Sequence, residues 1–381
     1  MKRTPVIALH ELGQSVWLDN INAGLIESGE LSRLIGEGSV YGVTSNPTIF
    51  KNAIAHDESS YPALISRLAS KGKSAEEIFD ALAARDIIRT ADLLAERFRN
   101  GSGRDGFVSL EVGPSLAHDT AGSIEEARRL WRLVDRPNLF VKIPGTPEGI
   151  PAIETAIAEG ISVNVTLLFS RSQYADVAAA YRRGIERRIR AGRPLDGLHS
   201  VASLFVSRLD TAVDKDLEAR AAKTTDESER RRLLDLRGKA AVANAIDVWE
   251  EYREQFFGPA FDDLRGEGAR PQWILWASTG TKNPAYPDTK YVDELACPDS
   301  INTMPRETLD AVLDHARVEG NRVDPAVEPA RRTRKEFESV GISLEEHCQK
   351  LLVDGVAAFS KSFDEMMDVI RERSAALAHR R

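Results

Sequence analysis

Short runs of apolar, often β-branched residues recur along the chain, and stretches with helical spacing of apolar residues separate them. The runs predict strands and the stretches predict helices. Several runs are apolar at consecutive positions, as expected for strands covered on both faces. We expect eight strands, at Val16–Ile21, Tyr41–Thr44, Phe107–Val112, Leu139–Ile143, Ser162–Thr166, Ser200–Val206, Trp273–Ala277 and Ser300–Thr303.

Capping-box patterns mark the starts of three helices, because a serine followed three residues later by a glutamate can satisfy two backbone amides. The patterns begin at Ser74, Ser123 and Ser343. They predict helices over Ser74–Asn100, over Ser123–Leu133 and over about 343–375, the last with one long apolar face. Shorter helices are expected at Glu30–Glu37 and Tyr61–Ser70.

Strands that alternate with helices indicate a parallel sheet. Eight such units close as a (β/α)8 barrel, whereas an open doubly wound sheet more often has about five to seven strands and a glycine-rich first turn. We therefore expect an α/β fold, with residues 1–381 forming a single (β/α)8 TIM barrel domain. The segment at about 208–270 is too long for one crossover helix, so it predicts a helical insertion between strands six and seven. The helix at about 343–375 should pack on the barrel.

Composition and charge limit the classes of partner that the protein can bind. The net charge of −8 argues against binding to nucleic acid or to an anionic membrane. The arginine-rich run Tyr181–Arg193 has helical spacing and an acidic interruption, which favour a solvated helix face. No run approaches the ~18 apolar residues of a membrane span, and no signal-peptide core is apparent. Only two cysteines are present, so we expect a reducing compartment and a cytoplasmic protein. We expect a monomer or a homodimer, which the sequence does not distinguish.

The run Phe140–Thr146 contains the most informative residue, Lys142, which stands among β-forming residues just before Pro144-Gly145. An unpaired ammonium is costly in apolar surroundings, and a neutral lysine amine is a nucleophile toward carbonyls. The alternative is a lysine that extends out of the strand end into solvent.

Polar residues end the other strands, and in a barrel these ends meet at the face that carries the active site. They are Asp19, Asn46, Glu111, Asn164, Thr166 and Ser278. Each has an ordinary alternative as a turn, cap or strand-end residue. Their convergence at one end of the barrel favours a site. Carboxylates beside Lys142 favour its charged form, a conflict that eases if one carboxyl is protonated or acts through a water.

The chain resembles the transaldolase family in its longer bacterial form. The resemblance rests on matching segments at successive strands and covers nearly the whole chain. These segments are Ser15–Asn20, Gly42–Thr48, Val108–Val112, Val141–Thr146, Asn164–Ser170, Ser203–Arg208, Trp276–Asn283 and Asn302–Pro305.

The resemblance implies a class I aldolase mechanism that transfers a dihydroxyacetone unit between sugar phosphates. By similarity, Lys142 forms the Schiff base, Asp19 is the acid/base, and Glu111 and Thr166 hold a catalytic water. Substrate contacts are implied for Asn46, Asn164, Ser203, Arg208 and Ser278. Lys282 stands near the place where shorter forms have a second phosphate-binding arginine, and Ser207 stands where they often have glycine.

Two other functions are compatible with the sequence. One is a simple Schiff-base aldolase acting on fructose 6-phosphate, and the other is a non-catalytic sugar-phosphate-binding protein. The seven histidines are scattered without pairing, so we expect no metal, and we expect no cofactor. Sugar phosphates are the expected partners in each case.

Overall fold

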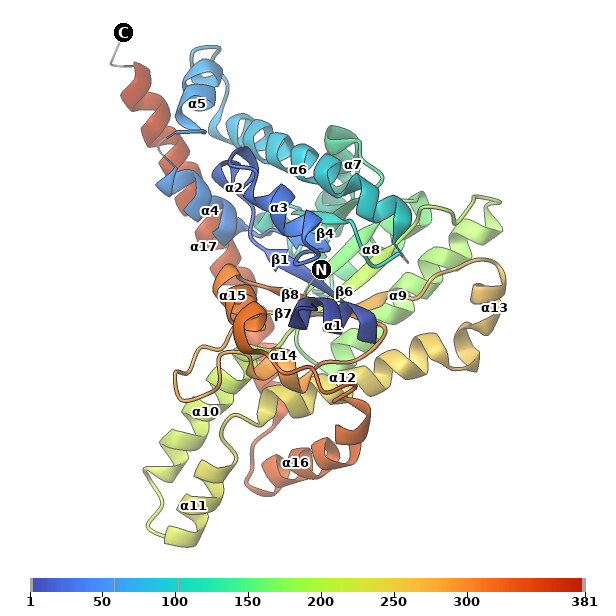
Figure 1. The fold of residues 1–381 in the computed structure, drawn as a ribbon, viewed down its shortest axis with the longest axis vertical. Helices are drawn as coiled ribbons and strands as arrows, with labels where there is room; N and C mark the ends of the chain where they lie inside the picture. The colour runs from blue at the N-terminus through green and yellow to red at the C-terminus, as the bar shows by residue number, and fades with distance from the viewer. Residues whose placement is uncertain (1–2, 58, 102, 379–381) are drawn as a thin grey trace.

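The computed structural model describes residues 3–57, 59–101 and 103–378. Within these residues, eight parallel strands close into a barrel in sequence order, with β1 beside β8 (Figure 1). The strands are β1 (Gln14–Asp19), β2 (Gly42–Thr44), β3 (Val108–Glu111), β4 (Leu139–Pro144), β5 (Val163–Leu168), β6 (Ser200–Phe205), β7 (Trp273–Ala277) and β8 (Ser300–Met304). The predicted (β/α)8 barrel is confirmed.

The first strand begins at Gln14, before the apolar run that predicts it, and ends at Asp19 rather than Ile21. Its first two residues are polar but buried. The Gln14 side chain donates a hydrogen bond to the Leu295 carbonyl at 2.8 Å, and Ser15 Oγ donates to Asp105 Oδ1 at 2.7 Å. Hydropathy alone misses such residues, because partners distant in sequence bind their side-chain donor groups.

Helices cover the outside of the barrel (Figure 1). Before the insertion and around β8 they are α1 (Pro5–Leu12), α2 (Ala23–Glu27), α3 (Glu30–Gly36), α4 (Pro47–His56), α5 (Pro62–Ala69), α6 (Ala75–Asn100), α7 (Thr120–Val134), α8 (Gly149–Glu159), α9 (Arg171–Arg190), α14 (Lys290–Glu294) and α15 (Arg306–His315). The helix ranges predicted from the sequence do not include α1, α2, α4, α8, α14 or α15.

The capping boxes have different outcomes. The one at Ser74 is confirmed, because Ser74 Oγ accepts from the Glu77 amide and the Glu77 carboxylate accepts from the Ser74 amide. The one at Ser123 is wrong, since α7 begins at Thr120 and is capped by Asp119. Ser123 lies inside the helix, and its hydroxyl donates a hydrogen bond to the carbonyl oxygen of Leu116, which precedes the helix.

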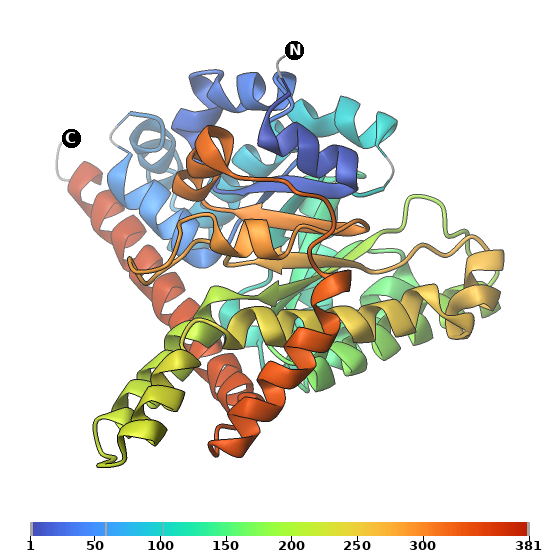
Figure 2. The same cartoon turned by 60° about the horizontal axis from the view of Figure 1, so that its bottom comes forward.

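The insertion between β6 and β7 consists of several helices, as predicted. They are α10 (Ser207–Ala221), α11 (Glu227–Asp235), α12 (Ala240–Phe257), the short 3-10 helix η2 (Pro259–Phe261) and α13 (Asp262–Gly266). Helices α10 and α11 project from the barrel as an arm, whereas α12 returns along α9 (Figures 1 and 2).

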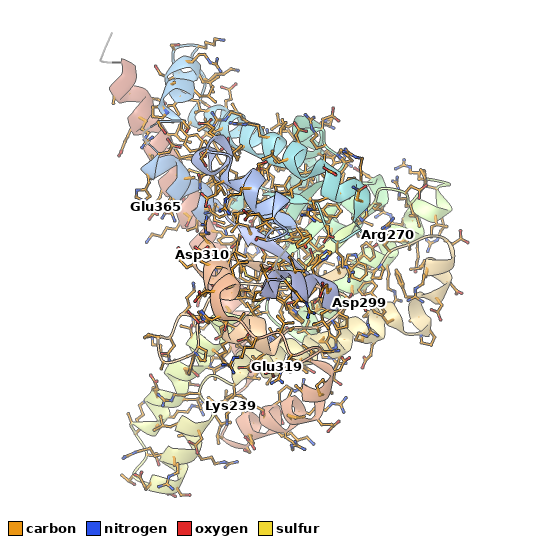
Figure 3. All side chains as sticks on the ribbon, in the orientation of Figure 1. Lys239, Arg270, Asp299, Asp310, Glu319 and Glu365 are labelled. Carbon is orange, nitrogen blue, oxygen red and sulfur yellow. The ribbon has the colours of Figure 1, made fainter. Side chains whose placement is uncertain are left out.

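After β8 and α15, the chain forms η3 (Asp324–Ala326), α16 (Val327–Ser339) and the long helix α17 (Leu344–Ala378). Helix α17 contacts α10, the end of β5, the turn η1 (Pro114–Leu116) that follows β3, and then α4 and α5. The predicted C-terminal helix on the barrel is confirmed, and it passes over the carboxyl-end side of the strands. Figure 3 shows Glu365 on this helix, and its carboxylate pairs with Lys51 of α4 at 2.9 Å.

Buried apolar residues form one cluster that extends along the chain from Val6 to Ile370. Cys297 and Cys348 are both buried and free. In the part of the chain that the structure describes, no helix combines the length and apolar character needed to cross a membrane.

Candidate active site

Three predicted site residues lie side by side on the neighbouring strands β3, β4 and β5. Parallel pairing places Glu111 opposite Lys142, and Lys142 opposite Asn164. Paired positions on neighbouring strands point to the same face of the sheet, so the three side chains form a row. Strand β6 extends the row, because Ser203 Oγ donates to Asn164 Oδ1 at 2.7 Å.

Lys142 is 4% exposed, so its amine ends inside the protein rather than in solvent. Nζ donates a hydrogen bond to the Ser45 carbonyl oxygen at 2.8 Å. It also lies 3.1 Å from Glu111 Oε2. The Ser45 carbonyl and the Glu111 carboxyl therefore hold the amine in a fixed position inside the barrel.

The two site carboxyls have shifted acidities. Burial raises the pKa of Glu111 above its ordinary value, while the positive charge of Lys142 opposes that shift. Burial likewise raises the pKa of Asp19, against Lys142 and a hydrogen bond from Thr44. Both groups therefore keep a proton to higher pH than they would in water. This direction agrees with the expectation that a carboxyl beside Lys142 is protonated and can act as a general acid.

Two threonines, to which the sequence analysis gave no role, hold Asp19. Thr44 Oγ1 donates to Asp19 Oδ1 at 2.6 Å, and Thr303 Oγ1 lies 2.6 Å from Thr44 Oγ1. Both threonines are buried and stand at the ends of β2 and β8, the strands that flank β1. The sequence does carry a signal, because a closed barrel places strands two and eight beside strand one.

Thr166 is fully buried, and its Oγ1 forms no hydrogen bond with any residue that the structure describes. The pairing of β5 with β6 shifts register just after Val165, and Leu167 has a left-handed φ of 58°. Such irregularities re-aim side chains at the rims of barrels. A buried hydroxyl without a partner is costly, so Thr166 can bind a water or a substrate hydroxyl.

Asn46 has the capping role that was one of the alternatives considered for it. Its Oδ1 accepts from the Ile49 amide at 2.9 Å and so caps the N-terminus of α4. The cap uses only the amide oxygen, which leaves the Nδ2 group for a substrate hydroxyl. The capping role also fixes the direction of the side chain.

The predicted phosphate contacts lie at the ends of β6 and β7. Arg208, the second residue of α10, forms no hydrogen bond or salt bridge with the described residues. Burial lowers its pKa, and Asp19 and Glu111 oppose that shift, so its guanidinium lies near both carboxyls. Lys282 is exposed, and its charge also lowers the pKa of Asp19. Ser278 has a φ of 54°, and its Oγ is 3.0 Å from Ser207 Oγ.

Two cavities reach the site. One of about 570 Å³ opens beside Asp19 and has Asn52 and Arg306 in its wall. A narrower one of about 280 Å³ reaches Asn46 and Glu111 from the side of α6 and α7. The first is within the size range of small-molecule sites. No group of three or more His, Cys, Asp and Glu side chains among the described residues is placed to hold a metal ion.

Barrels of this architecture carry their active sites at the carboxyl ends of the strands. A buried lysine amine beside carboxyls at that position suits the formation of a Schiff base with a carbonyl substrate. Fold and site together define the class of protein, a Schiff-base enzyme built on a (β/α)8 barrel.

Comparison with known proteins identifies the family. The family model described as Transaldolase/Fructose-6-phosphate aldolase matches residues 16–370. A Transaldolase of Thermobifida fusca is 47% identical over 373 residues, which cover 98% of this chain and 99% of that protein. A Transaldolase of Thiobacillus denitrificans is 48% identical over 356 residues, covering 93% and 96% of the two chains. The chain belongs to the transaldolase/fructose-6-phosphate aldolase family, as its motifs predict.

Proposed function

We propose that the protein is a transaldolase, a transferase that moves a dihydroxyacetone unit from a ketose phosphate to an aldose phosphate. The donor is sedoheptulose 7-phosphate or fructose 6-phosphate, and the acceptor is glyceraldehyde 3-phosphate or erythrose 4-phosphate. The family and the names of its relatives support this activity. The observation that carries it is the Lys142 amine, buried at the strand ends 3.1 Å from Glu111.

In the first step, the neutral Lys142 amine attacks the C2 carbonyl carbon of the donor. The carbonyl oxygen takes one proton from the attacking amine and a second from an acid and leaves as water, which converts the carbinolamine into a protonated Schiff base. Glu111 is the nearest acid, since its raised pKa keeps a proton available. Thr166 has a free hydroxyl in the same part of the barrel, so we propose that Glu111 and Thr166 together hold the water.

In the second step, Asp19 takes the proton of the C4 hydroxyl. The C3–C4 bond breaks, its electron pair moves into the Schiff base, and an aldose phosphate leaves with the new carbonyl. The three-carbon unit stays on Lys142 as an enamine. The acceptor aldehyde then reacts in the reverse direction, with Asp19 returning the proton, and hydrolysis frees Lys142. Thr44 and Thr303 hold the Asp19 carboxyl for both transfers.

The remaining predicted residues bind the substrate. Asn46, Asn164, Ser203 and Ser278 supply amide and hydroxyl groups at the strand ends for the sugar hydroxyls. Arg208 supplies guanidinium donors that no described residue occupies, which suits a phosphate. Lys282 adds a second positive charge. We propose that these two cations bind the phosphate of the donor and so fix its orientation in the site.

The simple aldolase is the second candidate, because the description of the matching family names both activities. The two differ in the fate of the enamine. A transaldolase keeps it until an acceptor arrives, whereas an aldolase protonates it and releases dihydroxyacetone.

An assay of fructose 6-phosphate with and without erythrose 4-phosphate separates the candidates. With the acceptor present, we expect sustained release of glyceraldehyde 3-phosphate, measured with a coupled dehydrogenase. Without it, release should stop after about one equivalent per site, because the three-carbon unit remains on Lys142. Sustained release of free dihydroxyacetone in the absence of acceptor would identify the aldolase instead.

We further propose that the enzyme acts in the pentose phosphate pathway in the cytoplasm, as a monomer or homodimer. The buried free thiols of Cys297 and Cys348 are compatible with a reducing compartment.

A further inference from the structure

Two phenyl rings hold the guanidinium of Arg208. Its Cζ lies 4.9 Å from the ring centre of Phe205, at the end of β6, and 5.8 Å from the ring centre of Phe359, in the middle of α17. Phe205 is 8% exposed and Phe359 is 3% exposed, so both rings are fixed by packing. The two contacts come from parts of the chain more than a hundred residues apart.

The approach of α17 to Arg208 depends on a glycine. A Cβ at Gly355 would lie 3.1 Å from Leu167 Cδ2 and 3.6 Å from Arg208 Nη1. The first distance is tighter than ordinary van der Waals contact, so the helix lies as close as the packing permits. One turn later the same face of the helix presents Phe359. Helix α17 therefore touches Arg208 directly and also covers Leu167, which follows Thr166.

Arginine is a long side chain, and ordering it costs rotamer entropy. Most arginines on this protein are ordered by carboxylates, but Arg208 forms no salt bridge with a described residue. Aromatic faces attract a cation without using its N–H donors. The two rings can thus order the guanidinium and leave its donors free for an anionic ligand.

We propose that Phe359 of α17 is a positioning residue that holds Arg208 ready for the phosphate group of the sugar substrate. The inference deepens the proposed function and rests on it. Phe359 acts through Arg208 and not on the reacting carbons, so its removal should weaken the binding of phosphorylated substrates and leave the chemistry on Lys142 intact.

The test compares Phe359→Leu with Phe337→Leu. Phe337 is a fully buried ring on α16, and it lines neither of the two cavities that reach the site. We expect Phe359→Leu to raise KM for fructose 6-phosphate and the inhibition constant of inorganic phosphate about fivefold. Turnover of unphosphorylated fructose should be unchanged, and Phe359→Tyr should restore KM. The control variant should keep the KM of the wild type.

Equal KM values for Phe359→Leu and the wild type would overturn the proposal, as would an equal loss with fructose and fructose 6-phosphate. If Phe359→Leu does not fold, Gly355→Ala tests the same contact between α17 and Arg208. Its Cβ displaces α17 or Arg208 without removing a ring, so KM for fructose 6-phosphate should rise while borohydride still traps Lys142. An unchanged KM in that variant contradicts the inference. Failure of the proposed function would appear differently, as the absence of any trapped sugar on wild-type Lys142.

Discussion

At the scale of single residues, the site balances two opposing demands. Lys142 must lose a proton to attack a carbonyl, but Glu111 is close enough to stabilise its charge. Burial opposes the ionisation of the carboxyls, because it raises the pKa of both Glu111 and Asp19. The cluster can thus exchange protons internally without exposing a charge to the apolar barrel. A neutral amine and a neutral acid can form together by transfer between partners.

Thr44→Val tests the control of Asp19. The hydroxyl of Thr44 donates to Asp19 Oδ1 and lowers the pKa of that carboxyl. Without it, the pKa of Asp19 should rise further, and the acidic limb of the pH profile of kcat/KM should move to higher pH. Thr90→Val is the control, because Thr90 is also buried but lies on α6. A profile identical to that of the wild type would show that Thr44 does not tune Asp19.

Most of the candidate residues could be found from the sequence because parallel strands place their ends together. Asp19, Glu111, Lys142, Asn164 and Thr166 all follow from that rule. Thr303 was given no role, although the predicted closure of the barrel places β8 beside the strand that carries Asp19. The roles of these residues in catalysis stay predictions until variants are assayed.

At the scale of elements, α10 joins the site to the helical insertion. It carries Arg208 and, two positions later, Asp210. Asp210 is 1% exposed, and its carboxyl accepts from the Ala241 amide at 2.7 Å and from Tyr291 OH at 2.8 Å. A carboxyl at this position satisfies an amide in the first turn of α12. The orientation of α10 relative to α12 depends on this contact.

Stability should depend on pH through Asp210. Burial raises its pKa from 3.8 to about 6. The folded state therefore binds this proton more tightly than the unfolded state, and the resulting stabilisation, complete below pH 3.8, is lost as pH rises through about 6. Between pH 5 and pH 7, the free energy of unfolding of the wild type should fall by about 1 kcal/mol relative to that of Asp210→Asn. Denaturant unfolding of both proteins at each pH measures this difference in free energy of unfolding. A difference that does not change with pH would contradict the prediction.

Element boundaries were harder to predict than the elements. The capping box at Ser123 fails because Asp119 offers an earlier cap, which the Gly122 amide contacts at 2.9 Å. Ser123 and Glu126 match the motif, but the helix begins three residues earlier and Asp119 is its cap. In contrast, the long apolar faces of α6 and α17 were sufficient to place both helices, because that burial determines most of their stability.

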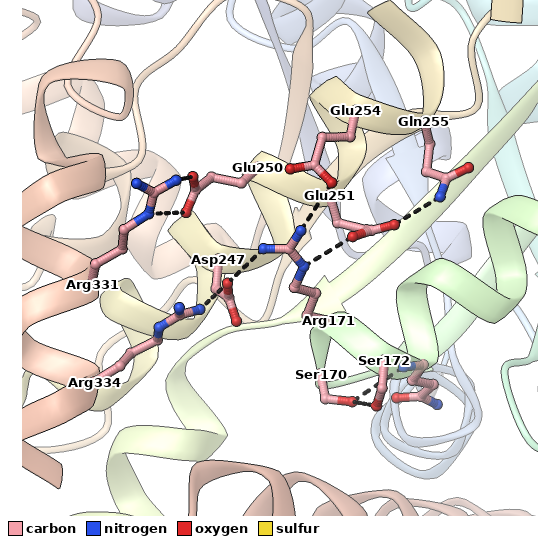
Figure 4. Close-up of polar contacts among 11 residues, drawn as sticks. Ser170, Arg171, Ser172, Asp247, Glu250, Glu251, Glu254, Gln255, Arg331 and Arg334 are labelled. Carbon is pink, nitrogen blue, oxygen red and sulfur yellow. Dashed lines mark hydrogen bonds and ion pairs between the residues drawn. The ribbon is translucent and has the colours of Figure 1, made fainter. Parts of the chain in front are cut away.

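At the scale of the whole molecule, ion pairs connect the barrel to the helices that follow it. Arg171, at the start of α9, contacts Asp247, Glu251 and Glu254 of α12 at 3.1, 2.9 and 3.0 Å (Figure 4). Asp247 also pairs with Arg334 of α16. The network links segments from both halves of the chain, and we infer that barrel and insertion fold as a single domain.

Arg171→Ala tests this connection. Removal of the guanidinium leaves three carboxylates close together, two of them largely buried, so we expect a loss of about 2 kcal/mol in the free energy of unfolding. Arg190→Ala is a matched control, because it removes an exposed arginine of the same helix with one partner. A single lowered transition is expected for Arg171→Ala. Two separate transitions would show that the insertion unfolds independently.

The central claim is that Lys142 carries the three-carbon unit covalently, and reduction with borohydride in the presence of fructose 6-phosphate tests it most directly. Peptide mass spectrometry should find a dihydroxyacetone-derived adduct on Lys142 of the wild type. Asp19→Ala should retain the whole six-carbon sugar phosphate there, because it forms the Schiff base but cleaves slowly. Lys142→Ala should be folded, inactive and unlabelled. An adduct on another lysine, or activity in Lys142→Ala, would contradict the account.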